Sequence, residues 1–211
     1  MIKAVIFDRD GVIIDIEGID IMSATKAFQE LGIELTNEDK TKIVGRHPQN
    51  YFKFLEKYNI PYDKFRPRQR ELYYEEFDNA NLFAETIGLI KRLHDMKLTL
   101  ALTTTARRKS TNTVLKRAEL EDIFNVIVTA EDYKTKKPDP ESYILTAKKL
   151  GVKPVDCVVV EDSEVGMRAA KSAGMTCIII PNDFTKKQDF TAADLVVESA
   201  DEIMKYIEKN K

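Results

Sequence analysis

The sequence predicts an α/β protein with a mostly parallel sheet and a small helical module inserted after the first strand. Short apolar runs alternate with helical patterns along most of the chain, which is typical of βαβ units. The runs Val158-Val159-Val160 and Ile178-Ile179-Ile180 are apolar at every position, as in strands that helices cover on both faces. Residues 17–82 break the alternation, because they contain no convincing strand.

The alternation sets the expected elements. Strands are expected over residues 3–7, 98–103, 125–129, 156–161, 176–180 and 194–197. Helices are expected over residues 85–96, 107–118, 140–150, 164–173 and 201–209. Between them, Ile21, Ala24, Phe28 and Leu31 recur at helical spacing. We therefore expect residues 17–82 to form a helical module beside the carboxyl ends of the strands.

Length and charge exclude several classes of protein. The chain has 211 residues and a formal net charge of −2, so one large domain or a domain with an insertion is expected, and general binding to nucleic acid or membranes is not. It shows no secretory leader and no apolar run of the ~20 residues that cross a bilayer. A cytoplasmic monomer or weak homodimer is expected. Cys157 and Cys177 begin strand-like runs and are expected to be buried thiols, with a disulfide between them left open.

Polar side chains gather where strands end. Four such segments are Asp8-Arg9-Asp10-Gly11, Thr103-Thr104-Thr105, Lys136-Lys137-Pro138-Asp139-Pro140 and Glu161-Asp162-Ser163. Taken singly, each has an ordinary explanation as a turn, a strand threonine, a solvated loop charge or a helix cap. The carboxyl ends of parallel strands share one edge of a sheet, so these side chains are expected to converge there.

The charges at that edge require a cation. Asp8, Asp10, Glu161 and Asp162 supply four acids, and Lys137 supplies one positive charge. Two unit charges ~4 Å apart repel by ~4 kcal/mol at an effective dielectric of ~20. A divalent ion held by oxygens relieves this repulsion, and Mg²⁺ suits carboxylates. Such a site suits phosphoryl transfer, in which one carboxylate attacks phosphorus and a second moves protons.

These segments, in this order, resemble the haloacid dehalogenase superfamily, in the branch with a helical cap that includes β-phosphoglucomutase-like and phosphoglycolate-phosphatase-like enzymes. The resemblance covers nearly the whole chain. It rests on the run from Phe7 to Asp15, on Lys137-Pro138-Asp139-Pro140, and on the run from Val160 to Ala170 with Ala173-Gly174-Met175. It implies a Rossmann-like three-layer parallel-sheet core, residues 1–15 and 83–211, with an α-helical cap domain, residues 16–82.

The resemblance also implies roles for the acids. Asp8 is the expected nucleophile, which forms a phospho-aspartate, and Asp10 is the expected general acid and base. The Asp8 side chain, the Asp10 backbone carbonyl and Asp162 would hold Mg²⁺, with Glu161 supporting the metal directly or through water. The expected activity is a Mg²⁺-dependent phosphatase for a small phosphorylated metabolite, such as a sugar phosphate or a phosphoglycolate-like compound.

Other residues are expected to bind the phosphorylated substrate. Lys137 would pair with the phosphoryl group and Asp8. Thr104 would supply the phosphate-binding hydroxyl, with Thr103 as the alternative, and Thr105 would lie beside it. In the cap, Gly45 and Arg46 match a segment that often faces substrate.

Two alternatives stay open. Sugar-phosphate mutases of this branch usually carry a His five residues after the acid that matches Asp15; here that position is Asp20, which favours hydrolysis. The other alternative is a binding or regulatory module without turnover. Arg9 departs from the usual pattern, because the residue between the two acids is usually apolar. It is expected either to touch a charged part of the substrate or to form a salt bridge at the domain boundary.

Overall fold

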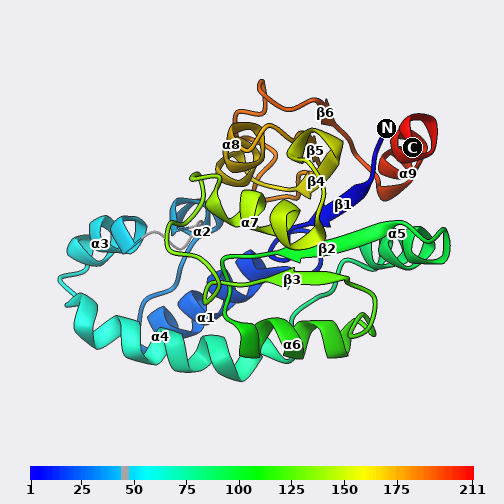
Figure 1. Cartoon of the computed structure of the whole chain (residues 1–211). Helices are drawn as coiled ribbons and strands as arrows, with labels where there is room; N and C mark the ends of the chain where they lie inside the picture. The colour runs from blue at the N-terminus through cyan, green and yellow to red at the C-terminus, as the bar shows by residue number, and fades with distance from the viewer. Residues whose placement is uncertain (44–47) are drawn as a thin grey trace. The chain divides into compact units, whose positions relative to one another are not determined.

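The computed structural model describes residues 1–43 and 48–211, which divide into two compact units. The core unit comprises Met1–Ile14 and Leu82–Lys211, and the helical unit comprises Asp15–Asn81. Both boundaries lie one residue earlier than the sequence predicts. Figure 1 traces the chain through both units.

The core unit is built on one parallel sheet. Its strands are β1 (Ala4–Phe7), β2 (Thr99–Thr103), β3 (Val126–Val128), β4 (Cys157–Glu161), β5 (Thr176–Ile179) and β6 (Leu195–Val196). They lie in the order β3-β2-β1-β4-β5-β6, and every neighbouring pair is parallel. The predicted α/β fold class is confirmed, and each predicted strand is present within two residues of its expected bounds.

Helices connect these strands and cover the sheet. They are α5 (Ala84–Asp95), α6 (Arg108–Arg117), α7 (Glu141–Leu150), α8 (Glu164–Ser172) and α9 (Ala200–Asn210), with a short 3-10 turn at Pro154–Asp156. The steps from β1 to β2 to β3 run toward one edge, and the steps from β3 to β4 to β5 run toward the other. Right-handed crossovers in opposite directions place α5 and α6 on one face and α7 and α8 on the other. The central strands are therefore covered on both sides.

Burial follows from this layering. All of β1 and β4 is buried, and β1 shows no solvent exposure at any residue. The helices add small and flexible side chains, among them Ala147, Met167 and Ala170. Cys157 and Cys177 belong to the same cluster and are free thiols, as expected from their apolar surroundings.

The strand register sets which residues meet at the carboxyl edge. Phe7 pairs with Leu102 on β2 and with Val160 on β4, so Asp8 is level with Thr103 and Glu161. The connection that leaves β1 runs to β2 on one side, and the connection that leaves β4 runs to β5 on the other, so the neighbouring strands β1 and β4 form the topological switch point of the sheet. Open parallel sheets bind their ligands in the crevice at that point.

The helical unit has its own core. Its helices are α1 (Ile16–Glu30), α2 (Asn37–Ile43), α3 (Pro48–Lys57) and α4 (Tyr62–Phe77). Phe28, Phe54 and Phe65 pack between them with ring centroids 4.5 and 5.2 Å apart. Asp15 begins α1 by accepting a 2.8 Å hydrogen bond from the Gly18 N–H. No helix within 1–43 and 48–211 has the length and apolar character to cross a membrane.

Candidate active site

The centre of the site is an ion pair between the first strand and the loop after β3. Asp8 follows β1 directly, and its Oδ1 accepts a 2.6 Å hydrogen bond from Lys137 Nζ. The same ammonium donates to Glu161 Oε1 at 2.7 Å and to the Tyr143 hydroxyl at 2.9 Å. The Lys137 side chain is only 6% exposed, so these three oxygens replace its hydration shell. The structure thus brings together three segments that are far apart in the sequence.

Glu161 has both carboxylate oxygens fixed by the protein. Oε1 accepts from Lys137 and from the Tyr143 hydroxyl at 2.8 Å. Oε2 accepts from the backbone N–H groups of Asp162 and Ser163 and from the Ser163 hydroxyl. A Cβ at Gly166 would lie 1.8 Å from Oε1, so the glycine on α8 leaves the space that the carboxylate fills. These bonds favour a supporting role for Glu161 over direct ligation of a metal.

The side chain of Asp162 is held by a residue that follows β5. Its Oδ2 accepts a 2.8 Å hydrogen bond from Nδ2 of Asn182, which follows β5. The Asn182 Oδ1 accepts the backbone N–H groups of Phe184 and Thr185, so the amide orientation is fixed and its NH₂ faces Asp162. A Cβ at Gly11 would lie 2.0 Å from Asp162 Oδ2, and this glycine has a φ of +79°. Both features require glycine at this turn.

The donor set fits a hard divalent cation. Oxygens of Asp8, Glu161 and Asp162 all lie within 4.8 Å of one another, and all three residues are buried. Three carboxylates face one ammonium, so two negative charges remain uncompensated. Oxygen ligands in this arrangement suit Mg²⁺.

Burial shifts the titration of these acids. It raises the pKa of Asp8 to about 7; Lys137 opposes this rise, and Glu161 and Asp10 add to it. Burial likewise raises the pKa of Asp162, with the negative charges of Glu161 and Asp8 contributing. The pKa of Lys137 lies above its usual value, because the attraction of Asp8 and Glu161 outweighs burial. A bound cation would favour the ionised form of each acid.

Asp10 is paired with its neighbour Arg9, so the salt bridge expected for that arginine is present, but it lies within the core unit rather than at the domain boundary. Arg9 is buried in the core unit, where its Nε and Nη2 donate to Asp10 Oδ1 at 2.7 and 2.5 Å. Its Nη1 donates to the hydroxyls of Ser110 and Thr111 on α6. Every partner of the Arg9 side chain in the described chain therefore belongs to the core unit. The charge count made from the sequence omitted this second cation.

The threonines after β2 differ in their surroundings. The Thr103 hydroxyl lies 2.6 Å from the Thr146 hydroxyl on α7, within the core. Thr104 is also buried, and its Oγ1 accepts a 3.1 Å bond from the Ala106 N–H, which leaves its proton to donate elsewhere. Thr105 is exposed. The geometry favours Thr104 over Thr103 as the hydroxyl that donates a hydrogen bond to a phosphate. No hydrogen bond within 1–43 and 48–211 joins either residue to the carboxylates.

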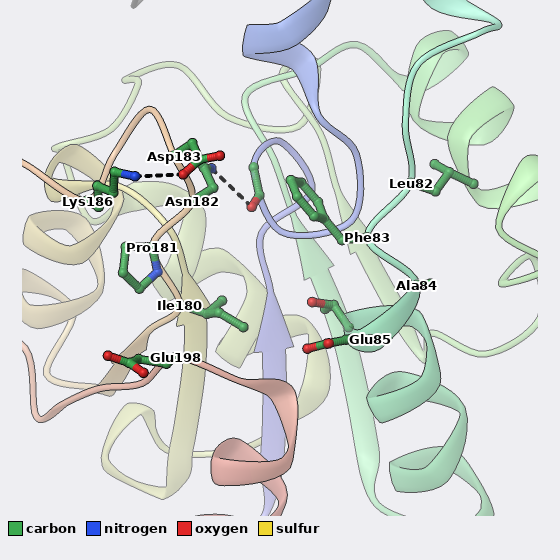
Figure 2. Close-up of a pocket in the computed structure, with 12 residues that line it drawn as sticks. Leu82, Phe83, Ala84, Glu85, Ile180, Pro181, Asn182, Asp183, Lys186 and Glu198 are labelled. Carbon is green, nitrogen blue, oxygen red and sulfur yellow. Dashed lines mark hydrogen bonds and ion pairs between the residues drawn. The ribbon is translucent and has the colours of Figure 1, made fainter.

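Gly45 and Arg46 lie outside the described residues. A cavity of about 500 Å³ lies beside the carboxylates in the core unit. It is lined by Gly11, by Phe83 just before α5 and Glu85 in the first turn of α5, and by the loop with Asn182 (Figure 2). Asp8, Lys137, Glu161 and Asp162 are not in its lining, so the cavity adjoins the carboxylate cluster through Asn182 and Gly11.

Two site residues escaped prediction from the sequence. Tyr143 has the spacing of an ordinary core residue on α7, and only the fold reveals its bonds to Lys137 and Glu161. Asn182 follows β5 at the same sheet edge as the acids. A search for polar side chains after every predicted strand would have found Asn182, whereas no local signal identifies Tyr143.

Comparison with known proteins agrees with this geometry. The family described as "Haloacid dehalogenase-like hydrolase" matches residues 5–180. The "Putative phosphatase YhcW" of Bacillus subtilis is 34% identical over 207 residues, covering 96% of this chain and 94% of the relative. The "Phosphorylated carbohydrates phosphatase" of Thermotoga maritima is 34% identical and covers 82% of each chain. A crystal structure of a "putative beta-phosphoglucomutase" from Thermotoga maritima has a TM-score of 0.84, 27% identity and full coverage of both chains. The chain therefore belongs to the haloacid dehalogenase-like hydrolases.

Proposed function

We propose that this phosphatase hydrolyses monoesters of small phosphorylated carbohydrates with Mg²⁺ and a phospho-aspartate intermediate on Asp8. The observation that carries the proposal is the Asp8 carboxylate at the switch point of the sheet, bound to Lys137 and clustered with Glu161 and Asp162. A short rigid strand holds the nucleophile, and the buried ammonium of Lys137 lies beside the position where phosphoryl charge accumulates.

The reaction has two displacements on phosphorus. In the first, an Asp8 oxygen attacks phosphorus, the ester P–O bond breaks, and the Asp10 carboxyl gives its proton to the leaving alcohol. In the second, a water oxygen attacks phosphorus while the Asp10 carboxylate takes its proton. The bond from phosphorus to Asp8 then breaks, which releases phosphate and restores Asp8. Lys137 balances charge on Asp8 and on the phosphoryl oxygens throughout.

The metal would be held by Asp8, Asp162 and the backbone carbonyl of Asp10. Glu161 and Asn182 would fix the surroundings of these ligands, since both are tied to Asp162 by hydrogen bonds. When bound, Mg²⁺ supplies positive charge that stabilises the phosphoryl oxygens. The buried acids, with two uncompensated negative charges, support this part of the proposal.

A phosphorylated carbohydrate is the favoured substrate class. The Thermotoga maritima relative that covers most of this chain is named a phosphatase of phosphorylated carbohydrates. Hydrolysis is favoured over mutase chemistry by Asp20, which stands where mutases of the branch carry a His. Its carboxylate is buried within the helical unit and accepts from the Tyr51 hydroxyl and from Gln69 at 3.0 Å. These bonds give Asp20 a structural role.

The test is a panel of sugar mono- and bisphosphates assayed for phosphate release with Mg²⁺, with excess chelator, and with the Asp8→Asn variant. Release that needs both Mg²⁺ and Asp8 supports the proposal. A hexose 1-phosphate with a trace of its bisphosphate separates the alternatives, because a mutase forms the 6-phosphate and a phosphatase forms free phosphate. No release from any substrate, or equal release by Asp8→Asn, would overturn the proposal.

A further inference from the structure

Arg9 is a charged side chain in a position that costs free energy. It is 2% exposed and is the largest of the fully buried side chains in the described chain. Burying a guanidinium is unfavourable unless each of its donors finds a partner. An apolar side chain could fill the same space without this cost. The partners of Arg9 therefore indicate what the charge does.

Those partners fix the guanidinium in one orientation. Its Nη1 donates to Ser110 Oγ at 3.1 Å and approaches Thr111 Oγ1 at 3.5 Å. Both hydroxyls donate their own protons to the Arg107 carbonyl at 3.0 Å, so their oxygens are set to accept from Arg9. Thr111 is fully buried, which keeps water from competing for this contact. The first turn of α6 thus anchors one end of the guanidinium.

The other end of the guanidinium meets a single oxygen of Asp10. Both Nε and Nη2 donate to Oδ1, at 2.7 and 2.5 Å. Oδ2 has no hydrogen-bond partner within the described ranges, and the Asp10 side chain is 26% exposed. An oxygen that already accepts two N–H donors is the poorer place for a proton. The acidic proton of Asp10 then belongs on Oδ2.

We propose that Arg9 is a positioning residue that reserves Asp10 Oδ2 for proton transfer, an inference that rests on the proposed acid–base role of Asp10. In the first displacement, the Oδ2 proton goes to the leaving alcohol as its bond to phosphorus breaks. In the second, Oδ2 takes the proton of the attacking water as the bond from Asp8 to phosphorus breaks. Arg9 does not touch the reacting atoms; it acts through Asp10, with α6 as the support.

Substrates with different leaving groups distinguish a positioning role of Arg9 from a merely structural one. Departure of p-nitrophenol needs little protonation, whereas a sugar alcohol needs a general acid. Arg9→Leu should lower kcat/KM for a sugar phosphate by about 10-fold or more, and for p-nitrophenyl phosphate by less than about 3-fold. The variant is expected to fold, because replacing one member of this pair with an apolar side chain leaves Asp10 partly hydrated. Arg92→Leu removes a surface pair with Asp201 and should change neither value.

A double-mutant cycle tests whether Arg9 acts on the reaction through Asp10. Asp10→Asn alone should show the same leaving-group bias, and Arg9→Leu should add none in the Asp10→Asn background, because the two residues act as one unit. Ser110→Ala with Thr111→Val keeps Arg9 but removes its anchor, and should reproduce the bias in weaker form; this arm applies even if Arg9→Leu fails to fold. Thermal unfolding of every variant monitors the fold.

The outcomes distinguish a failure of the proposed role of Arg9 from a failure of the proposed acid–base role of Asp10. If Asp10→Asn shows the bias but Arg9→Leu lowers both substrates equally or neither, Arg9 is structural and this inference is wrong. The inference is also wrong if Arg9→Leu adds its full bias in the Asp10→Asn background, or if the α6 double variant shows no bias. If Asp10→Asn itself shows no bias, the acid–base role of Asp10 is wrong, and the role of Arg9 falls with it.

Discussion

Lys137 Nζ lies 2.6 Å from Asp8 Oδ1, and neither side chain is more than 8% exposed. The ammonium reaches Glu161 as well, so one lysine holds both the proposed nucleophile, Asp8, and Glu161 in place. We expect this cation to support both the fold and the proposed reaction, since removing it would leave buried carboxylates uncompensated.

Lys137→Met tests both roles. We expect kcat to fall by about 100-fold or more, because a group that stabilises phosphoryl charge is lost. We also expect the free energy of unfolding to fall by about 3 kcal/mol, since buried charges lose their partner. Urea unfolding measures the second effect, and added Mg²⁺ should recover part of the stability but not the activity. Lys136→Met, at the exposed neighbouring position, should change neither quantity.

Asn182→Leu tests the support of Asp162. The substitution keeps the size of the side chain but removes the donor to Asp162 Oδ2. Residues that orient metal ligands typically affect metal affinity by about 10- to 100-fold, so we expect the Mg²⁺ concentration at half-maximal activity to rise by about 10-fold. Asn210→Leu is a matched control at an exposed position of α9, where within the described residues the side-chain amide bonds to the Tyr206 carbonyl alone. Equal Mg²⁺ dependence of the two variants would contradict a supporting role for Asn182.

Gly166→Ala tests the space for Glu161. The new Cβ would lie 1.8 Å from Glu161 Oε1, so the carboxylate must move and lose its bonds to Lys137 and Tyr143. We expect lower activity and a loss of about 1–3 kcal/mol in stability. Gly88→Ala on α5 is the control, because beyond the adjacent backbone of its own helix no atom of the described residues lies within 4 Å of its Cβ position, and helix propensity should stabilise that variant by about 0.5–1 kcal/mol. A Gly166→Ala protein as stable and active as Gly88→Ala would exclude this steric role.

The environment of Asp132, a residue outside the candidate active site, predicts that the stability of the protein depends on pH. Burial alone would raise the pKa of this carboxyl, but hydrogen bonds from the Thr129 N–H and from Lys149, with the charge of Arg108, lower it to about 2. A lowered pKa in the folded state stabilises the protein above the ordinary value near 4, and this contribution disappears as the pH falls toward 2. Because solvent screens these partly exposed pairs, Asp132→Asn should cost only about 1 kcal/mol at pH 7, and progressively less between pH 4 and pH 2. Urea unfolding across this range measures the difference, and a constant difference would contradict the linkage.

Much of the fold follows from local patterns in the chain. The apolar runs of β4 and β5 identify central strands, and the alternation with helices leaves few arrangements of a parallel sheet. The placement of Asp8 and Glu161 after strands was enough to predict that they meet, because parallel strands end at one edge. The confirmed α/β class rests on these patterns.

Other features depend on contacts that no local pattern encodes. Arg9 turns into the core because its partners Ser110 and Thr111 lie on a helix 101 and 102 residues away in the sequence. Tyr143 looks like an apolar core residue, and the role of its hydroxyl is visible only when Lys137 and Glu161 lie beside it. The sequence predicts which strands end in charged groups, while tertiary packing decides how those charges are paired.

Trapping the covalent intermediate tests most directly whether Asp8 is the nucleophile. The protein is mixed with p-nitrophenyl phosphate and Mg²⁺, quenched in acid within the first turnover, reduced with borohydride and analysed by peptide mass spectrometry. An acyl phosphate is reduced whereas a free carboxylate is not, so we expect homoserine in place of Asp8 in wild type, and no phosphate release by Asp8→Asn. An unreduced Asp8 at every quench time, together with phosphate release by Asp8→Asn, would contradict the proposed mechanism.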